Sequence, residues 1–104
     1  MCTIEMYTTV GSRDEAVKIS TLITESKLAA CAQITEIESF FHWEGFVNRQ
    51  IEFRILFKTI EDSYFKIQEI ILDNHSYDLP AIHAIKINKI YEPYRNWIIE
   101  NSNQ

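Results

Sequence analysis

The spacing of hydrophobic and polar residues changes along the chain, and each change marks the boundary of a predicted element. Residues 3–9 alternate and are rich in β-forming side chains, which predicts a first strand. Ser12, with Glu15 three residues later, is typical of a helix-capping box, and apolar side chains then recur at helical spacing. The pattern therefore predicts a first helix over residues 13–27.

The longest β-pattern lies in the middle of the chain. Residues 30–43 alternate, the turn residues Glu44 and Gly45 follow, and residues 51–59 alternate again, which predicts a long hairpin. We expect the apolar face of the second arm to be buried and the opposite face to be mixed. The apolar face consists of Ile51, Phe53, Ile55 and Phe57, and the mixed face of Glu52, Arg54, Leu56 and Lys58.

The last third of the chain predicts three more elements. An apolar stripe indicates a second helix over 61–74, and Pro80 then interrupts the backbone. Residues 81–89 are predicted to form a fourth strand, and 92–101 a short closing helix. Residues 102–104 are expected to fray.

The element order βαββαβ, with one further helix, predicts an α+β ferredoxin-like fold in a single domain over residues 1–104. Two helices can cover only one face of a four-stranded antiparallel sheet. The hairpin nevertheless carries many aromatic residues along its length, so part of its surface is expected to contact another chain. We therefore expect a homo-oligomer.

Composition narrows the classes of partner. The net charge of −5 and the absence of a basic run argue against nucleic acid and anionic membrane surfaces. No apolar stretch approaches the length of a membrane span, so the expected location is the cytoplasm. Cys2 and Cys31 are too few for a disulfide framework and do not form a CxxC pair, which predicts reduced thiols.

No glycine-rich phosphate loop, HExxH or GxSxG motif occurs, so the chemistry rests on scattered residues. His42, His75 and His83 could each contribute to a metal site, although packing or surface roles are the commoner alternative. An acidic cluster on the hairpin would suit a hard cation, or it could protect a strand edge. The cluster consists of Glu36, Glu38, Glu44 and Glu52.

Two further side chains have a functional and a structural interpretation. Lys58 could bind a ligand, or it could lie with its stem on apolar surface. Cys31 could be reactive, but a packing role as a buried thiol is favoured.

Several separated motifs together resemble the CutA divalent-cation-tolerance family over nearly the whole chain. They are KLAACA at 27–32, SFFHWEG at 39–45, KT at 58–59, HSYDLPAI at 75–82, and Tyr94 with Trp97. The resemblance implies a tight homotrimer similar to the PII nitrogen-regulatory proteins, with the hairpins packed between subunits. It also implies a role in the response to metal ions, with copper or another divalent cation as the bound ion and no organic cofactor.

The resemblance identifies His75 as the metal-ligand candidate, and three copies could meet on a threefold axis. Copper-binding relatives carry a cysteine and a second histidine at the positions of Tyr7 and Asn74. Phe41, Phe46 and Ser76 also depart from the family pattern: they replace a tyrosine, a lysine and a proline, respectively.

Two alternatives stay open beside metal tolerance. The first is a PII-like signalling or scaffold trimer that binds a small molecule or protein in clefts between subunits, where the candidates are Trp43, Glu52, Lys58 and Tyr77. The second is a small enzyme that uses His75 with Glu52 as an acid–base pair, although no catalytic motif is recognised.

Overall fold

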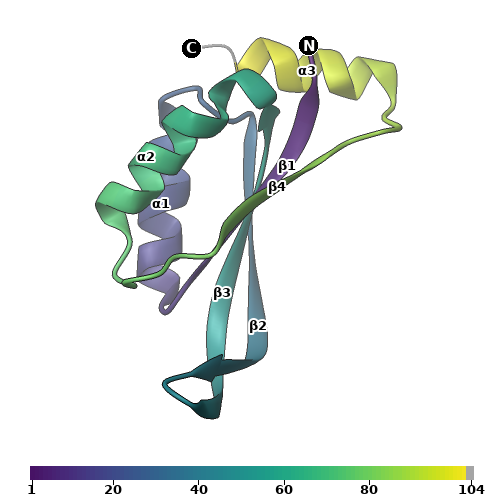
Figure 1. Cartoon of the computed structure of the whole chain (residues 1–104). Coiled ribbons are helices and arrows are strands. Elements are labelled where there is room, and N and C mark those ends of the chain that lie inside the picture. Colours follow the sequence, from purple (N-terminus) through teal and green to yellow (C-terminus); the bar gives the residue numbers. More distant parts are fainter. Residues whose placement is uncertain (103–104) are drawn as a thin grey trace.

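The computed structural model describes residues 1–102 and contains one four-stranded antiparallel sheet flanked by helices (Figure 1). The strands are β1 (Thr3–Val10), β2 (Cys31–Trp43), β3 (Phe46–Ile60) and β4 (Ile82–Lys86), in the spatial order β2-β3-β1-β4. The helices are α1 (Arg13–Glu25), α2 (Tyr64–Asn74) and α3 (Glu92–Asn101), and a 3-10 turn over Glu61–Ser63 precedes α2. The predicted α+β fold with its closing helix is confirmed.

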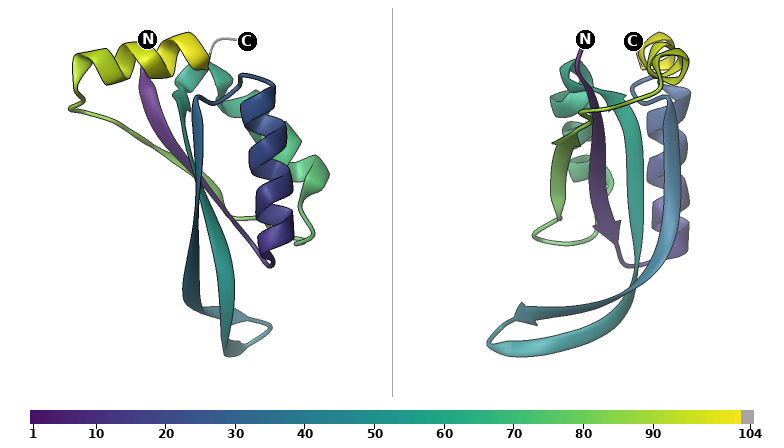
Figure 2. Two further views of the ribbon diagram at one scale, coloured as in Figure 1. Left: turned by 180° about the vertical axis from the view of Figure 1, so that it is seen from behind. Right: turned by 90° about the vertical axis from the view of Figure 1, so that its right-hand side faces the viewer.

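Helices α1 and α2 pack on one face of the sheet, and α3 lies across one end of the molecule (Figures 1 and 2). The core forms between this face and the two helices, because the alternate residues of β1 and β3 point toward the helical stripes. Its members include Ile4, Met6 and Val10 of β1, Ile55 and Phe57 of β3, Ile19 and Ile23 of α1, and Ile67 and Ile71 of α2. No helix within residues 1–102 is long and apolar enough to cross a membrane.

Helix α1 ends two residues earlier than predicted because Lys27 adopts a left-handed backbone conformation, with φ 57°. The amide of Lys27 donates to the carbonyl of Thr24, and the amide of Leu28 donates to the carbonyl of Ile23. These two bonds form a Schellman motif, in which glycine usually occupies the left-handed position. The buried side chains of Leu28 and Ile23 complete the motif.

The chain after α1 is held by residues far away in the sequence. The Thr59 hydroxyl donates to the carbonyl of Leu28 at 2.6 Å, and the Ala30 amide donates to Ser102 Oγ at 3.1 Å. The Ser63 hydroxyl donates to the carbonyl of Ser102, which is fully buried. The prediction that Ser102 frays is therefore wrong, because its backbone and side chain both have partners; residues 103–104 lie outside the described part.

Three other element boundaries differ from those predicted from the sequence. Strand β4 ends at Lys86, not at Lys89: Ile87 makes one more backbone bond, to Thr3, and the carbonyl of the preceding Cys2 is taken by the amide of Glu61. The first turn of the predicted second helix is a 3-10 turn. Strand β3 begins at Phe46, five residues before the predicted start, because the hairpin loop has only two residues.

The β2–β3 hairpin projects beyond the rest of the sheet. Its loop is formed by Glu44 and Gly45, which both have positive φ, and this turn geometry matches the twist of paired strands. Strand β1 stops opposite Phe53, so residues 46–52 pair only with β2. Ile51 is 50% exposed in this segment, contrary to the prediction that its face is buried. The projecting end curves sideways beneath the rest of the molecule (Figure 2).

The left-handed conformation of Lys27 generates a stability prediction. Lys27→Gly removes the β-carbon that disfavours this conformation and should raise the free energy of unfolding by about 0.5–1 kcal/mol, after allowance for the greater freedom of glycine in the unfolded chain. The change is measured by guanidinium denaturation. The control Lys27→Ala keeps the β-carbon and should change stability little; equal effects of the two substitutions would contradict the explanation.

Candidate functional site

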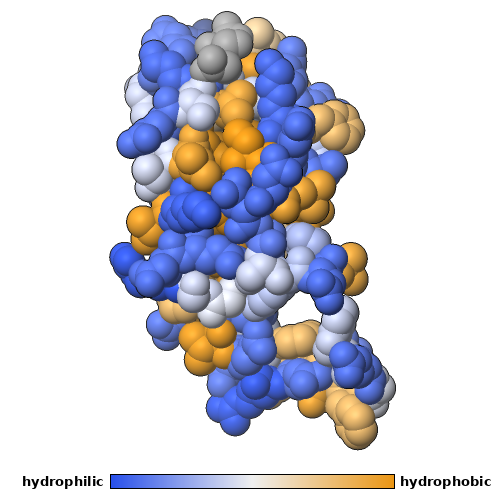
Figure 3. Space-filling model, turned by 90° about the vertical axis from the view of Figure 1, so that its left-hand side faces the viewer, coloured by the Kyte–Doolittle hydropathy of each residue, from blue (hydrophilic) through white to orange (hydrophobic). Residues whose placement is uncertain are grey.

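The curved end of the hairpin and the loop that follows α2 border a cavity of about 760 Å³ that is open to solvent on one side. The hairpin contributes residues 39–43 and the inward-facing residues of 48–52, and the loop contributes residues of 76–81. Thr9, near the end of β1, closes one side. The space-filling view in Figure 3 shows the hollow between the hairpin end and the body. The cavity therefore exists because β2 and β3 continue past β1.

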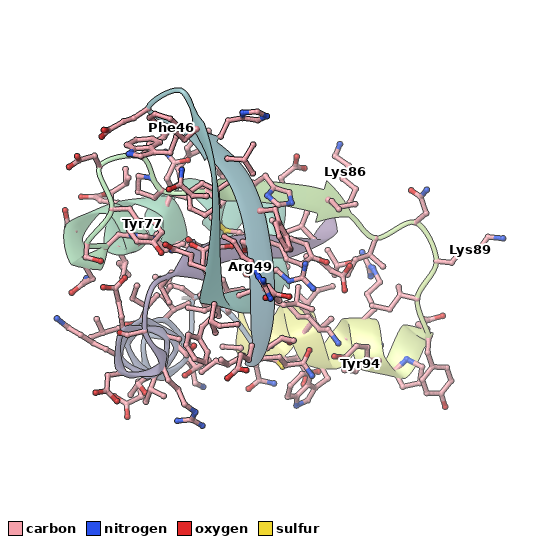
Figure 4. The ribbon with its side chains drawn as sticks, turned by 90° about the horizontal axis from the view of Figure 1, so that it is seen from below. Phe46, Arg49, Tyr77, Lys86, Lys89 and Tyr94 are labelled. Atoms are coloured by element: carbon pink, nitrogen blue, oxygen red, sulfur yellow. The ribbon has the colours of Figure 1, made fainter. Side chains whose placement is uncertain are left out.

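Tyr77 connects the loop after α2 to the hairpin. Its hydroxyl donates to Glu52 Oε2 at 2.7 Å and accepts from the side-chain amide of Gln50 at 3.0 Å. Figure 4 shows Tyr77 beside the two strands of the hairpin, with Phe46 at the hairpin end. Glu52 is only 6% exposed, although it belongs to the predicted mixed face, because Tyr77 and the curved hairpin cover it.

His75 fixes the position of this loop. Its Nε2 donates to the carbonyl of Thr9 at 2.8 Å, and its Nδ1 accepts from the amide of Tyr77 at 3.1 Å. These partners place the proton of a neutral imidazole on Nε2. The side chain is completely buried, and Glu15 Oε2 lies 3.8 Å from Nδ1. His75 thus joins the end of β1 to the loop that carries Tyr77.

Glycine at position 11 makes room for Tyr77. A β-carbon on Gly11 would lie 3.1 Å from the Tyr77 hydroxyl oxygen, which is closer than normal packing allows without displacement. From the sequence, Gly11 is only a turn residue, and Gln50 is only a polar residue in a strand. Nothing local in the sequence associates them with Tyr77, because all three meet through the tertiary fold.

Burial and the hydrogen bond to Glu52, in that order, raise the pKa of Tyr77 from 10.0 to about 12. The phenol is therefore protonated at neutral pH and acts as a donor to the carboxylate. This arrangement satisfies a carboxylate that is otherwise withdrawn from water.

Within one chain, the structure brings together three of the four predicted cleft residues. Trp43, Glu52 and Tyr77 line the cavity. Lys58 lies elsewhere on β3, where its Nζ is 5.2 Å from the centre of the Tyr94 ring. Interaction with the Tyr94 hydroxyl, opposed by partial burial, raises the pKa of Lys58.

The metal-ligand candidates do not converge within one described chain. Residues 1–102 contain no group of three or more His, Cys, Asp or Glu side chains placed to hold an ion. Both ring nitrogens of His75 are bonded to backbone groups. His83 stacks on Tyr7 with 5.0 Å between ring centres, and Glu38 pairs with Arg49 at 2.7 Å.

The candidate acid–base pair, His75 with Glu52, is linked through Tyr77 and not by a direct hydrogen bond within the described residues. Tyr77 lies between His75 and Glu52, because its amide contacts the first and its hydroxyl contacts the second. Cys2 and Cys31 are both free and partly buried.

The raised pKa of Tyr77 predicts how stability depends on pH. Because the folded-state value lies above the unfolded one, the contribution of protonated Tyr77 is present below pH 10 and is lost as the pH rises toward 12. Tyr77→Phe should lower the free energy of unfolding by about 1–2 kcal/mol at pH 8, and the difference from the wild type should shrink between pH 10 and 12. Urea unfolding across this range measures both effects.

Tyr91→Phe is the matched control, because Tyr91 is 76% exposed and its hydroxyl belongs to no hydrogen bond found within residues 1–102. A Tyr77→Phe protein as stable as the wild type at pH 8 would show that the Glu52 contact contributes nothing.

The sequence matches known proteins over nearly its whole length. The family model described as "CutA1 divalent ion tolerance protein" matches residues 4–101. The divalent-cation tolerance protein CutA of Archaeoglobus fulgidus is 37% identical over 95 residues, which are 91% of this chain and 93% of the relative. The corresponding protein of Pyrococcus horikoshii is 34% identical and covers 95% of this chain and 97% of the relative.

Solved structures agree with the sequence relatives. The structure of the A. fulgidus protein, described as a periplasmic divalent cation tolerance protein CutA, superposes with a TM-score of 0.94 at 35% identity and covers 97% of this chain and 99% of that one. CutA1 from P. horikoshii gives 0.91 at 33% identity, with the same coverage. The sequence, the strand order and the long curved hairpin therefore show that this chain belongs to the CutA1 divalent ion tolerance protein family.

Proposed function

We propose that the protein acts in divalent-cation tolerance, as a homotrimer that responds to metal ions. The observation that carries this proposal is the family match, which covers residues 4–101. Relatives aligned over more than nine tenths of this chain are named divalent-cation tolerance proteins. The cytoplasmic location remains a prediction, and relatives are described as periplasmic in A. fulgidus and chloroplastic in Arabidopsis thaliana.

The exposed surface of the hairpin supports self-association. Large apolar side chains are exposed on both faces of the projecting part of the hairpin, and exposed apolar surface of this kind is typical of an interface. They are Phe40, Trp43, Phe46, Val47 and Ile51, with exposed fractions between 45% and 75%. A second copy of the chain would bury this surface.

For the bound ion, the proposal is copper or another divalent cation held by donors from more than one subunit. One chain offers no complete ligand set within residues 1–102, whereas threefold symmetry would multiply a single ligand by three. His75 remains the candidate ligand, and binding through it requires a ring nitrogen to exchange its present backbone partner for the ion.

The second candidate function is a PII-like one, in which the trimer binds a small molecule or protein partner. The observation that favours it is the cavity of about 760 Å³, which falls in the size range of small-molecule sites. Trp43, Glu52 and Tyr77 lie together in its wall. We assign no catalytic residue, because the Tyr77 hydroxyl that donates to Glu52 in the wall has a pKa raised to about 12 and so stays protonated at neutral pH.

The metal proposal is tested with chelator-treated protein. We expect Cu(II) or another divalent ion to bind saturably, at a fixed ratio to trimer, in equilibrium dialysis with metal analysis. His75→Gln keeps an amide donor for Thr9 but removes the imidazole, and should weaken binding at least tenfold. His42→Gln, on the exposed hairpin, is the control and should bind as the wild type does. Absence of saturable binding would refute the metal-binding form of the proposal.

The trimer is tested by size-exclusion chromatography with light scattering at micromolar concentration. The expected mass is three times the 12.3 kDa of one chain. Ile51→Glu places a charge in the exposed apolar surface and should reduce the mass toward that of the monomer. Glu36→Gln, also on the hairpin, should leave the mass unchanged. A wild-type monomer would contradict the proposal.

A further inference from the structure

The cavity under the hairpin is aromatic on several sides. Phe41 and Trp43 come from the face of β2 that also carries the inward-facing residues of β3, and Tyr77 comes from the loop beyond α2, so aromatic residues of both segments line the same space. The faces of aromatic rings carry a negative electrostatic potential, which attracts a cation that has lost part of its water. Arg49 shows this on the same hairpin, because its guanidinium carbon lies 5.5 Å from the centre of the Phe40 ring.

The charged groups around the cavity have one sign. Glu52 and Asp78 are among the residues that line it, and no lysine or arginine is. The charge of the neighbouring Arg49 is already paired with Glu38, at 2.7 Å. The chain as a whole has a net charge of −5, so the long-range field also favours a positive ligand.

We propose that this cavity binds a small organic cation of the ammonium class, with its charged group near Glu52 and its carbon atoms against the aromatic walls. The inference rests on the second candidate function, that the cavity binds a small molecule, and names the class of that molecule. Glu52 is 6% exposed and its Oε2 accepts one hydrogen bond, from Tyr77. A bound ammonium would compensate the carboxylate charge that burial has withdrawn from water.

The same walls disfavour two other classes of ligand. Phosphate groups are usually held by arginine, lysine or clustered backbone amides, and the lining contains no basic lysine or arginine for a nucleotide. A bare metal ion needs several direct donors, and residues 1–102 provide no cluster of three ligating side chains. An organic cation needs only ring faces and one carboxylate.

The first experiment compares matched ligands. Choline and its uncharged isostere 3,3-dimethylbutan-1-ol have similar shapes and differ in charge, and ATP represents the anionic class. Trp97→Phe removes the tryptophan of α3, which stacks on Tyr94, and leaves Trp43 as the fluorescent reporter in the cavity wall. We expect choline to change Trp43 fluorescence saturably, the isostere to bind roughly tenfold or more weakly, and ATP not to compete. Isothermal titration of the unmodified trimer checks the affinity.

The second experiment removes the charge at Glu52. Glu52→Gln keeps the shape and an acceptor for Tyr77, and should weaken choline binding roughly tenfold while leaving the isostere unaffected. Glu36→Gln removes an exposed hairpin carboxylate outside the cavity and should change neither ligand. Circular dichroism and the trimer mass verify that each variant is folded.

The experiments distinguish a failure of the cation class from a failure of the cavity as a ligand site. If the isostere or ATP binds as tightly as choline, the cavity is a ligand site but the cation class is wrong. If no probe binds at millimolar concentration, including the case in which a neighbouring subunit fills the space, both the cavity function and the inference fail. Equal losses in Glu52→Gln and Glu36→Gln would also overturn the role given to Glu52.

Discussion

The difference in length between two paired strands is the constraint on which the rest of the structure depends. Strand β3 has 15 residues and its neighbour β1 has eight, so pairing with β1 ends at Phe53. Beyond that point the hairpin has no third strand and no helix behind it. It is free to curve, it leaves apolar side chains exposed, and it borders the cavity, so the proposed interface and the candidate ligand site have one common origin.

The loop from His75 to Tyr77 holds the hairpin and the end of β1 in fixed positions around the cavity. His75 contacts the end of β1 through its ring, and Tyr77 reaches the hairpin through its hydroxyl. Gly11 allows the approach because it has no side chain. Three segments that are distant in sequence are therefore fixed relative to one another by side chains of a single short loop, and movement of this loop would alter the cavity wall directly.

The sequence predicted the element order and most boundaries, because alternation and helical spacing report local burial. The closing helix was predicted at the observed residues. Predictions failed where distant partners decide the outcome: Lys27 is left-handed although it is not glycine, and Ser102 is buried. In the candidate site, aromatic and acidic residues were predictable as candidates by type, whereas the placement of Gln50 and Gly11 followed only from the fold.

The bond between Ala30 and Ser102 has a consequence for the order in which the chain can acquire its structure during synthesis. Its two residues are separated by 72 positions, and it closes the junction between α1 and β2. A nascent chain can form α1 and the hairpin early, but this junction cannot be completed until residue 102 has left the ribosome. The apolar side chains of the hairpin are thus exposed to solvent before the joint at its base is fixed.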